Sequence, residues 1–294
     1  MEIKGVDVSR YQGNIDWQRV KNAGVQFAIL RCGTGYSGGT KDSKFELNYT
    51  AAKKVGLPVG AYFYSYAKTV EDAKNEAKLV LTWISGKQFE YPIVFDIEDK
   101  TQSTLSKSTI SNIIRAFAEK LESLGYFVTI YANKDWLEKR IDDDCKTRYD
   151  IWLAQWSKKP TYKGNFGMWQ YTSSGKVDGI SGNVDMDIAY KDYPTIIKKK
   201  NCNGYFVAKN EVDKIVEKMK QPAVKTFKKG QMVALKYTPL YASATTNKVS
   251  GYKSGAFYVY DGEQVNGRYR VTNKQKNCGR KPAGVFVTGW VKLQ

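Results

Sequence analysis

Residues 91–99 read YPIVFDIED, and this stretch decides both the fold and the candidate site. A short apolar run that ends in acids is typical of a buried strand, which we expect over residues 92–98. Successive side chains of a strand point to opposite faces. One face therefore carries three apolar residues, Ile93, Phe95 and Ile97. The other face carries Val94, Asp96 and Glu98, so the strand sets two carboxylates beside each other.

The sequence around this strand alternates between short apolar runs and helical patterns, one of which follows a capping box of Thr69 and Asp72. We expect eight strands, at residues 5–9, 25–31, 59–66, 92–98, 126–131, 150–155, 167–171 and 184–189. Helices separate the first five, which predicts a parallel sheet, whereas loops join the last three. Eight strands in about 190 residues favour a closed barrel that lacks its last helices. A doubly wound open sheet is the alternative.

The sequence changes character near residue 198. A helix is expected over residues 211–220, and from residue 225 glycines separate short β-rich runs, which predicts a small all-β barrel. The expected fold class is therefore α/β with a second, all-β part. The expected organisation is a barrel over residues 1–198, a helical connector over 199–224 and a small β domain over 225–294.

Composition excludes several kinds of chemistry. The chain of 294 residues contains no histidine, which excludes Ser-His-Asp and Cys-His nucleophiles and zinc sites built on histidine. No CxxC pair and no metal spacing occurs among the four cysteines, Cys32, Cys145, Cys202 and Cys278. We expect free thiols made in a reducing cytosol, and neither a metal nor a cofactor. The chemistry must then rest mainly on carboxylates, Tyr, Lys or Cys.

Charge is spread unevenly along the chain. Residues 1–198 hold 28 basic and 24 acidic residues, a net charge of +4, whereas residues 199–294 hold 19 and 5, a net charge of +14. A basic C-terminal third predicts a polyanionic partner such as nucleic acid, an anionic membrane or an anionic wall polymer; a merely charged surface is the alternative. The N-terminus lacks the features of a signal peptide, and no apolar run is long enough to span a membrane, so we expect no membrane insertion.

The two carboxylates at the end of the strand over residues 92–98 are candidates for catalysis. Barrel enzymes place their active sites at the C-terminal ends of strands, where Asp96 and Glu98 lie. Repulsion between neighbouring carboxylates separates their pKa values, which leaves one acid and one anion near neutral pH. Cleavage of a glycosidic bond needs these two groups. The alternative is that the acids cap the next loop, as Asp99 is expected to do.

The same alternation places further polar and aromatic residues at other strand ends. Asp7 and Asp185 face the barrel interior, and Trp156 and Trp169 lie close by. Seven more residues are candidate sugar contacts: Tyr62, Tyr64, Tyr131, Trp152, Gln155, Gln170 and Asp187. Each aromatic residue alone is more often part of a core. Convergent carboxylates with aromatic walls are typical of a sugar-binding cleft.

Six motifs then occur in a fixed order: GVDVSRYQGNIDW at 5–17, GAYFYSY at 60–66, PIVFDIE at 92–98, WLAQW at 152–156, MWQYT at 168–172 and VDMDIAY at 184–190. Together they resemble glycoside hydrolase family 25, the muramidases common among phage endolysins and bacterial autolysins. The resemblance implies an irregular TIM-like barrel of five βα units followed by three strands. It also implies hydrolysis of the β-1,4 bond from N-acetylmuramic acid to N-acetylglucosamine in peptidoglycan.

The resemblance also assigns roles to the acids. It makes Glu98 the general acid/base and Asp96 the second catalytic carboxylate, with Asp7 and Asp185 as supporting acids. The last family motif usually has Asn where this chain has Asp187; the extra charge either raises a neighbouring pKa or lets Asp187 share the role of Asp185. Two mechanisms stay open. A close carboxylate pair favours retention with Asp96 as nucleophile. An N-acetyl sugar can instead attack its own anomeric carbon while Asp96 orients the amide, which is the hypothesis that we prefer.

Residues 225–294, above all 228–240 and the final GVFVTGWVKL, are similar to SH3-like wall-binding modules of endolysins. This similarity implies retention on a polyanionic Gram-positive wall that salt would weaken, with peptidoglycan and an anionic wall polymer as partners and no specific nucleic acid. We expect a phage endolysin, made in the host cytoplasm without a signal peptide and released to act on the wall. The alternatives are an autolysin, an inactive wall-binding protein, a chitinase-like enzyme and a nucleic-acid-binding protein, although the last has no recognisable helix-turn-helix or zinc module.

Overall fold

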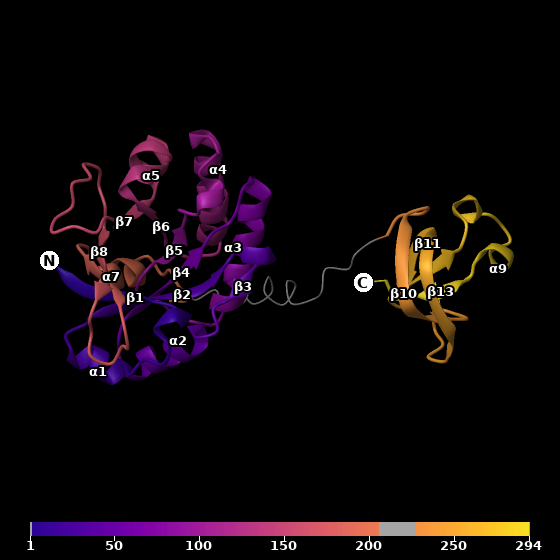
Figure 1. Ribbon diagram of the computed structural model, residues 1–294, viewed down its shortest axis with the longest axis horizontal. Coiled ribbons are helices and arrows are strands. Elements are labelled where there is room, and N and C mark those ends of the chain that lie inside the picture. The colour runs from indigo at the N-terminus through magenta and orange to yellow at the C-terminus, as the bar shows by residue number, and fades with distance from the viewer. Residues whose placement is uncertain (1, 206–226, 294) are drawn as a thin grey trace. The chain divides into compact units, whose positions relative to one another are not determined.

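The computed structural model describes residues 2–205 and 227–293. The chain divides into two compact units, one on either side of the undescribed stretch in sequence (Figure 1). The first unit contains the predicted barrel and the second contains the predicted β domain. The helix expected over residues 211–220 lies outside the described residues.

The first unit is built on a closed barrel of eight strands. In chain order these are β1 (Ile3–Val8), β2 (Phe27–Thr34), β4 (Val59–Tyr64), β5 (Ile93–Asp96), β6 (Val128–Asn133), β7 (Asp150–Ala154), β8 (Met168–Gly175) and β9 (Val184–Ala189). Each strand pairs with the next, β9 closes the ring on β1, and the short strand β3 (Thr40–Lys41) is added to β2 outside the ring. The predicted barrel is therefore confirmed, and the open-sheet alternative is wrong.

The direction of β9 differs from that of the other barrel strands. The other seven strands of the ring run parallel to one another, whereas β9 runs antiparallel to both of its neighbours, β8 and β1. Residues 176–183 are enough for a hairpin turn but too few for the crossover that a parallel strand needs. The start of β9 therefore lies at the same end of the barrel as the C-terminal ends of the other strands.

Alternation along the strands separates two apolar clusters. Outward-pointing side chains, among them Val6, Val8 and Phe95, pack against the helices. Inward-pointing side chains fill the barrel: Phe27, Ile29, Tyr91, Val94, Tyr131, Trp152 and Met168. The alternation predicted for residues 92–98 is thus confirmed, because Val94 lies inside and Phe95 lies outside.

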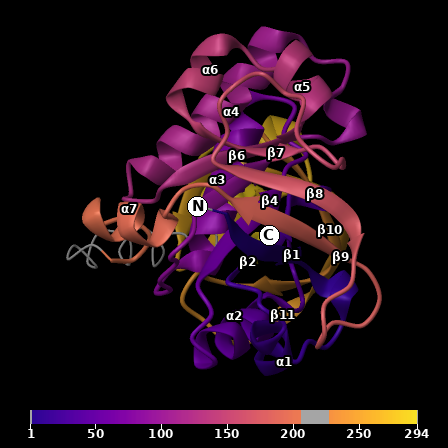
Figure 2. The same cartoon turned by 90° about the vertical axis from the view of Figure 1, so that its left-hand side faces the viewer.

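The helices of the first unit are α1 (Trp17–Asn22), α2 (Phe45–Lys54), α3 (Val70–Ile84), α4 (Lys107–Glu122), α5 (Lys134–Lys139), α6 (Asp143–Arg148) and α7 (Tyr193–Lys199). The predicted capping box begins α3: Thr69 Oγ1 accepts from the Asp72 amide at 3.1 Å, and Asp72 Oδ2 accepts from the Thr69 amide at 3.0 Å. Figure 2 shows α4, α5 and α6 together on one side of the barrel and α1 and α2 on another. The short helices α6 and α7 were not predicted, because one or two turns carry little periodicity.

The described residues after α7 continue the first unit. Asn203 is buried; its side chain accepts from the Phe127 amide at 2.7 Å and donates to the Tyr91 carbonyl at 2.9 Å. The Tyr205 hydroxyl donates to Glu90. The first residues of the predicted connector are therefore packed on the barrel.

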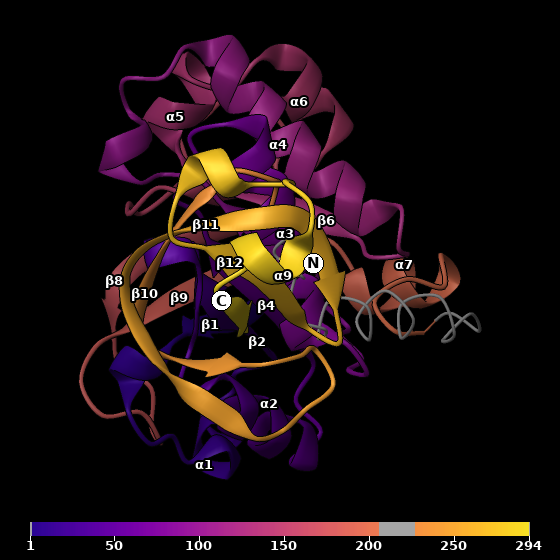
Figure 3. The same ribbon diagram turned by 90° about the vertical axis from the view of Figure 1, so that its right-hand side faces the viewer.

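The second unit is a small closed barrel of β10 (Met232–Tyr241), β11 (Val249–Val265), β12 (Arg268–Thr272) and β13 (Gly289–Val291), seen in orange and yellow in Figure 3. A short helix, α9 (Ala283–Phe286), precedes its last strand. Its core consists of Val233, Leu235, Leu240, Phe257, Val259, Tyr269, Val271 and Val291. The prediction of a small all-β barrel is confirmed.

Candidate active site

Most of the predicted site residues gather at the mouth of the barrel, which is the end where β1 to β8 finish. Asp7 comes from β1 and Asp96 from β5. Asp185 comes from the start of β9 and pairs in register with Asp7. Asp96 is flanked in register by Tyr64 of β4 and Tyr131 of β6. The reversed direction of β9 is thus what delivers a third carboxylate to the mouth.

The pair from the FDIED segment occupies two different positions. Asp96 is the last residue of β5 and is 4% exposed, whereas Glu98 follows the strand and is half-buried. Glu98 makes no hydrogen bond to any described residue. Asp99 caps the turn at Lys100–Gln102, where its Oδ1 accepts from the Thr101 amide at 2.8 Å. The capping alternative therefore holds for Asp99 alone, and Glu98 is free to act on a ligand.

Burial and mutual repulsion raise the pKa values of Asp96 and Glu98, which favours a proton on this pair of carboxyl groups. Burial, assisted by the charges of Asp185 and Asp99, raises the pKa of Glu98 to about 7. Burial and the charge of Glu98 raise the pKa of Asp96 well above its ordinary range, although Arg31 opposes this. Asp96 Oδ1 has no hydrogen-bond partner in the part of the chain that the structure describes. The site thus offers an acid that titrates near neutral pH and a carboxyl oxygen that still needs a donor.

Gln170 organises the floor of the mouth. Its Nε2 donates to Asp7 Oδ2 at 2.7 Å. Its Oε1 accepts from the Tyr131 hydroxyl at 3.0 Å and from Trp156 Nε1 at 2.9 Å. Burial and the charges of Asp187 and Asp185 raise the pKa of Asp7, and the hydrogen bond from Gln170 lowers it. Gln170 therefore fixes the orientation of the Asp7 carboxyl group.

Asp187 lies deeper in the barrel than Asp185. It is fully buried, and its Oδ1 accepts from Trp152 Nε1 at 2.9 Å. Burial raises its pKa well above the ordinary range, with a further contribution from the charge of Asp185. Asp187 in turn raises the pKa of Asp7. The structure thus supports the first interpretation of this substitution, in which the extra acid raises the pKa of a neighbour.

Replacing Asp187 with Asn is expected to stabilise the first unit at neutral pH by about 1–3 kcal/mol, because the neutral amide removes a buried acid whose Oδ2 has no hydrogen-bond partner among the described residues. The pKa of Asp187 is higher in the folded chain than in the unfolded chain, so the acid lowers stability as the pH rises between these two values. The gain should therefore grow from pH 4 to pH 8. Urea unfolding followed by helical circular dichroism measures it; a gain that shrinks with rising pH would contradict the assignment.

The other predicted sugar contacts divide into three groups. Tyr62 and Tyr64 are half-buried at the mouth. Trp152 is 1% exposed and its ring packs edge-on against Tyr131 at 4.7 Å between centroids, so both support the floor from inside the barrel. Gln155 is used by a loop, since its Oε1 accepts from the Thr161 amide at 3.0 Å and its Nε2 donates to Thr161 Oγ1 at 2.8 Å. Its contacts thus give it a structural role.

Two further residues lie at the mouth: Trp156, which the sequence analysis placed near the acids, and Arg31, which it did not single out. Trp156 is 63% exposed and is tethered to Gln170, so its ring is available to a ligand. Arg31, near the end of β2, donates from Nε to Asp42 at 2.7 Å and lies with its guanidinium 4.9 Å from the ring centre of Tyr11. The alternation of Phe27, Ile29 and Arg31 already places this cation inside the barrel.

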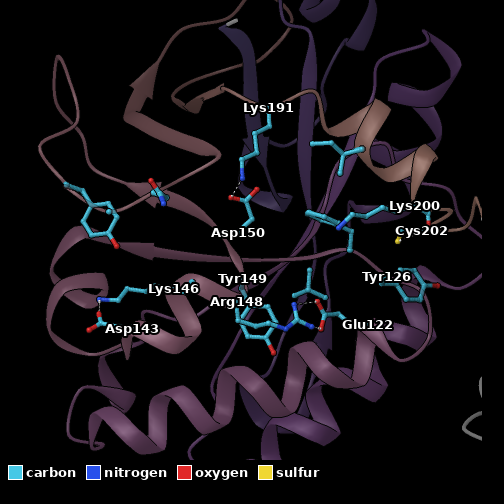
Figure 4. A pocket seen from close by; sticks show the side chains of 17 residues that line it. Glu122, Tyr126, Asp143, Lys146, Arg148, Tyr149, Asp150, Lys191, Lys200 and Cys202 are labelled. Atoms are coloured by element: carbon cyan, nitrogen blue, oxygen red, sulfur yellow. Dashed lines mark hydrogen bonds and ion pairs between the residues drawn. The ribbon is translucent and has the colours of Figure 1, made fainter.

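A pocket of about 1020 Å³ lies at the opposite end of the barrel, where β6 and β7 begin (Figure 4). Figure 4 shows three ion pairs among its charged side chains: Arg148 with Glu122 at 2.5 Å, Lys191 with Asp150 at 2.9 Å and Lys146 with Asp143 at 2.7 Å. Barrel enzymes place their active sites at the other end; the first of these pairs joins α6 to α4, and the second joins the segment after β9 to β7. We therefore regard this pocket as structural.

The described residues contain no group of three His, Cys, Asp or Glu side chains arranged to hold a metal ion. None of the helices within residues 2–205 and 227–293 is long and apolar enough to cross a membrane.

Comparison with known proteins gives a match over the barrel. The family model of the glycosyl hydrolases family 25 matches residues 6–180, which leaves the second unit outside the match. The autolytic lysozyme of Clostridium acetobutylicum is 30% identical over 186 residues, which make up 63% of this chain and 55% of that protein. Lysozyme M1 of Streptomyces globisporus is 30% identical over 199 residues, or 62% of this chain and 66% of that protein. The chain thus spans only part of the length of these relatives.

A solved structure shows the same fold. The modular autolysin LytC of Streptococcus pneumoniae, in complex with a synthetic peptidoglycan ligand, has a TM-score of 0.59 and 27% identity to this chain. The alignment covers 64% of this chain and 47% of that one.

Proposed function

Because the chain belongs to the glycosyl hydrolases of family 25, we propose that it is a muramidase that hydrolyses the β-1,4 bond from N-acetylmuramic acid to N-acetylglucosamine in peptidoglycan. One observation carries the proposal: Glu98 stands at the barrel mouth beside Asp96, without a hydrogen bond to the described residues, and its pKa is raised to about 7. This is the state that a general acid needs at neutral pH.

In the first step, protonated Glu98 donates to the glycosidic oxygen as the bond from the anomeric carbon breaks. The acetamido oxygen of the N-acetylmuramic acid attacks that carbon and forms a cyclic intermediate. Asp96 accepts the acetamido N–H through Oδ1, the buried oxygen that lacks a partner among the described residues. In the second step, ionised Glu98 takes a proton from a water molecule whose oxygen opens the ring. The carboxyl groups of Asp7 and Asp185 supply negative charge around the reacting sugar.

The alternative is direct attack by Asp96 on the anomeric carbon, which would retain the same configuration through a covalent ester. The unpartnered Asp96 Oδ1 favours the first route, because the acetamido N–H supplies the donor that this buried oxygen lacks among the described residues. Mass spectrometry of the protein quenched during turnover on a slow fluorinated substrate separates the two routes. A glycosyl adduct on Asp96 would overturn the substrate-assisted route.

The chemical ends of the products show which bond the enzyme cleaves. Purified Gram-positive walls are digested, the fragments are reduced with borohydride, and their ends are identified by mass spectrometry. Reduced N-acetylmuramic acid ends are expected. Reduced N-acetylglucosamine ends or new peptide ends would assign a different bond, cleavage of chitin in place of peptidoglycan would indicate a chitinase-like enzyme, and absence of turnover would indicate a wall-binding protein.

Activity is expected to fall about tenfold per pH unit above pH 7, because a donor with a pKa of about 7 loses its proton there. The charge of Asp185 helps to raise this pKa, so Asp185→Asn is expected to move the basic limb of the kcat/KM profile to lower pH. Initial rates on soluble glycan fragments between pH 5 and 9 measure both profiles. A limb at the same pH in both proteins would show that Asp185 does not act on Glu98.

We further propose that the second unit is an SH3-like module that retains the enzyme on the polyanionic Gram-positive wall, as in a phage endolysin. Its closed four-strand barrel and the +14 charge of residues 199–294 support this. The four cysteines are unpaired, which agrees with synthesis in a reducing cytoplasm before release to the wall. Wall binding is expected to weaken as salt rises from 0.05 to 0.5 M, measured by co-sedimentation; binding that is insensitive to salt would point to a neutral sugar or peptide pocket.

A further inference from the structure

Two stacked tyrosines lie on the surface of the second unit. Tyr237 is 73% exposed and Tyr252 is 49% exposed. Their rings are 4.4 Å apart between centroids and nearly parallel, at an angle of 6°. Exposed aromatic surface that is built and held in place marks an interaction site more often than a scattered apolar residue does.

The backbone is distorted to hold Tyr237 in this position. The β10–β11 ladder pairs Leu235 with Gly255 and Thr238 with Lys253, so two residues of β10 face only Ser254. Tyr237 has a φ of 44°, a left-handed conformation that is unfavourable for a bulky side chain. Ser254 Oγ accepts from the Tyr237 amide at 2.8 Å, which holds the bulge. Bulges re-aim side chains, and strained residues of this kind cluster at binding sites.

Tyr237 lines a pocket of about 590 Å³ together with Met232, Lys236 and Lys292. Both lysines are exposed, and no described acidic residue lines this pocket. Residues 225–294 contain only two acids, Asp261 and Glu263, and both are paired with Arg270. Among the described residues, the pocket is therefore a positively charged site with an aromatic wall and no acid to neutralise the two lysines.

We propose that this pocket, the Tyr237 pocket, binds a phosphodiester-linked wall polymer. Such a chain alternates a C–H-rich polyol or sugar unit, which packs on the free face of Tyr237, with a phosphate, which Lys236 and Lys292 bind as point charges. Lysine binds phosphate in proteins as a point charge, which suits a chain whose phosphates are spaced along it. The inference rests on the proposed function, because it names the wall component that retains the muramidase.

The test uses the full-length chain and soluble poly(glycerol phosphate) as the probe, at fixed ionic strength. The double variant Lys236→Gln/Lys292→Gln is compared with Lys274→Gln/Lys276→Gln, which removes the same charge from two other exposed lysines of the unit. The first pair is expected to weaken binding by about tenfold or more, and the second by much less. If both double variants lost the same amount of binding, the positive charge of the unit would act non-specifically, and the proposal that this pocket binds the polymer would be overturned.

The aromatic wall is tested separately. Tyr237→Ala is expected to weaken binding by about tenfold, whereas Val285→Ala, which removes another exposed apolar side chain, should not. Tyr237→Phe should retain binding, and thermal unfolding of each variant checks that the unit still folds. Unchanged binding in a folded Tyr237→Ala would overturn the proposal.

Walls from which acid has removed the phosphate polymers show whether the pocket binds the polymer or peptidoglycan. Stripped walls are expected to lose most of the bound protein, and equal binding to stripped walls would assign the pocket to peptidoglycan instead. The same stripped walls supply the muramidase assay, in which the three pocket variants and the two control variants should release reduced N-acetylmuramic acid ends as the unaltered chain does. Failure of the proposed function would appear as missing ends, and failure of this inference as unchanged polymer binding.

Discussion

Replacing Glu98 with Gln is expected to lower kcat for wall hydrolysis by about 10²–10⁴-fold, the usual contribution of a positioned general acid. Glutamine keeps the size of the side chain but has no proton to give to the leaving oxygen. Because Glu98 makes no hydrogen bond to the described residues, the change breaks no contact of the fold, and the unfolding midpoint should not fall. The readout is the release of reduced N-acetylmuramic acid ends per minute at pH 6.

Glu76 provides the matched control. Burial also raises its pKa to about 7, but its carboxyl group accepts from Ser65 Oγ at 2.7 Å and from the Tyr66 amide at 2.8 Å. Glu76→Gln keeps one oxygen to accept from the Tyr66 amide, while its new NH2 group can donate to Ser65 Oγ, so this variant should retain most of the activity. If both variants lose activity equally, a raised pKa and burial would explain the loss, and Glu98 would have no special role. If Glu98→Gln retains activity, the general acid is a different residue.

The second large effect concerns stability. Trp152→Ala is expected to destabilise the first unit by about 3–5 kcal/mol, because it opens a cavity inside the barrel. It also removes the indole N–H that donates to Asp187 at 2.9 Å, which adds the cost of a buried acceptor without a donor. Urea unfolding at pH 7 measures the total. A loss below about 1 kcal/mol would mean that the barrel collapses around the gap or that the indole is not packed.

A double-mutant cycle isolates the hydrogen bond from the cavity. Trp152→Phe removes the N–H and keeps most of the ring, and it is combined with Asp187→Asn. The two changes are expected to be non-additive by about 0.5–3 kcal/mol, as for other residues in direct contact. Strict additivity would show that Trp152 and Asp187 do not interact in solution.

Much of the site followed from strand alternation alone. The period of two places Asp96, Asp7 and Asp185 toward the interior. In the structure Asp7 and Asp96 are buried, and Asp185 pairs in register with Asp7. The same rule would have found Arg31, because it lies two residues after Ile29 and four after Phe27, which both point into the barrel core. A resemblance based on motifs did not draw attention to it.

The burial depth of individual side chains and the direction of β9 could not be predicted from the sequence. Alternation predicts that Trp152 points inward, but it does not predict how deeply the side chain is buried. Trp152 was predicted to contact sugar, whereas in the structure it is buried and supports the floor of the mouth. Gln155 follows a strand end like the other candidates, yet the loop over residues 156–162 folds back on its amide, and only the tertiary structure decides this. The antiparallel direction of β9 likewise depends on the length of a turn.

The hairpin that reverses β9 leaves its turn on the rim of the mouth. Residues 176–183 form this turn, and the Gly179 carbonyl accepts from the Asp16 amide at 2.9 Å while Asp178 pairs with Arg19 at the start of α1. The turn is outside the ladder that closes the ring, so its length is decoupled from the geometry of the acids beneath it. The turn can therefore be lengthened or shortened to change the shape of the rim, while the register between Asp7 and Asp185 stays the same.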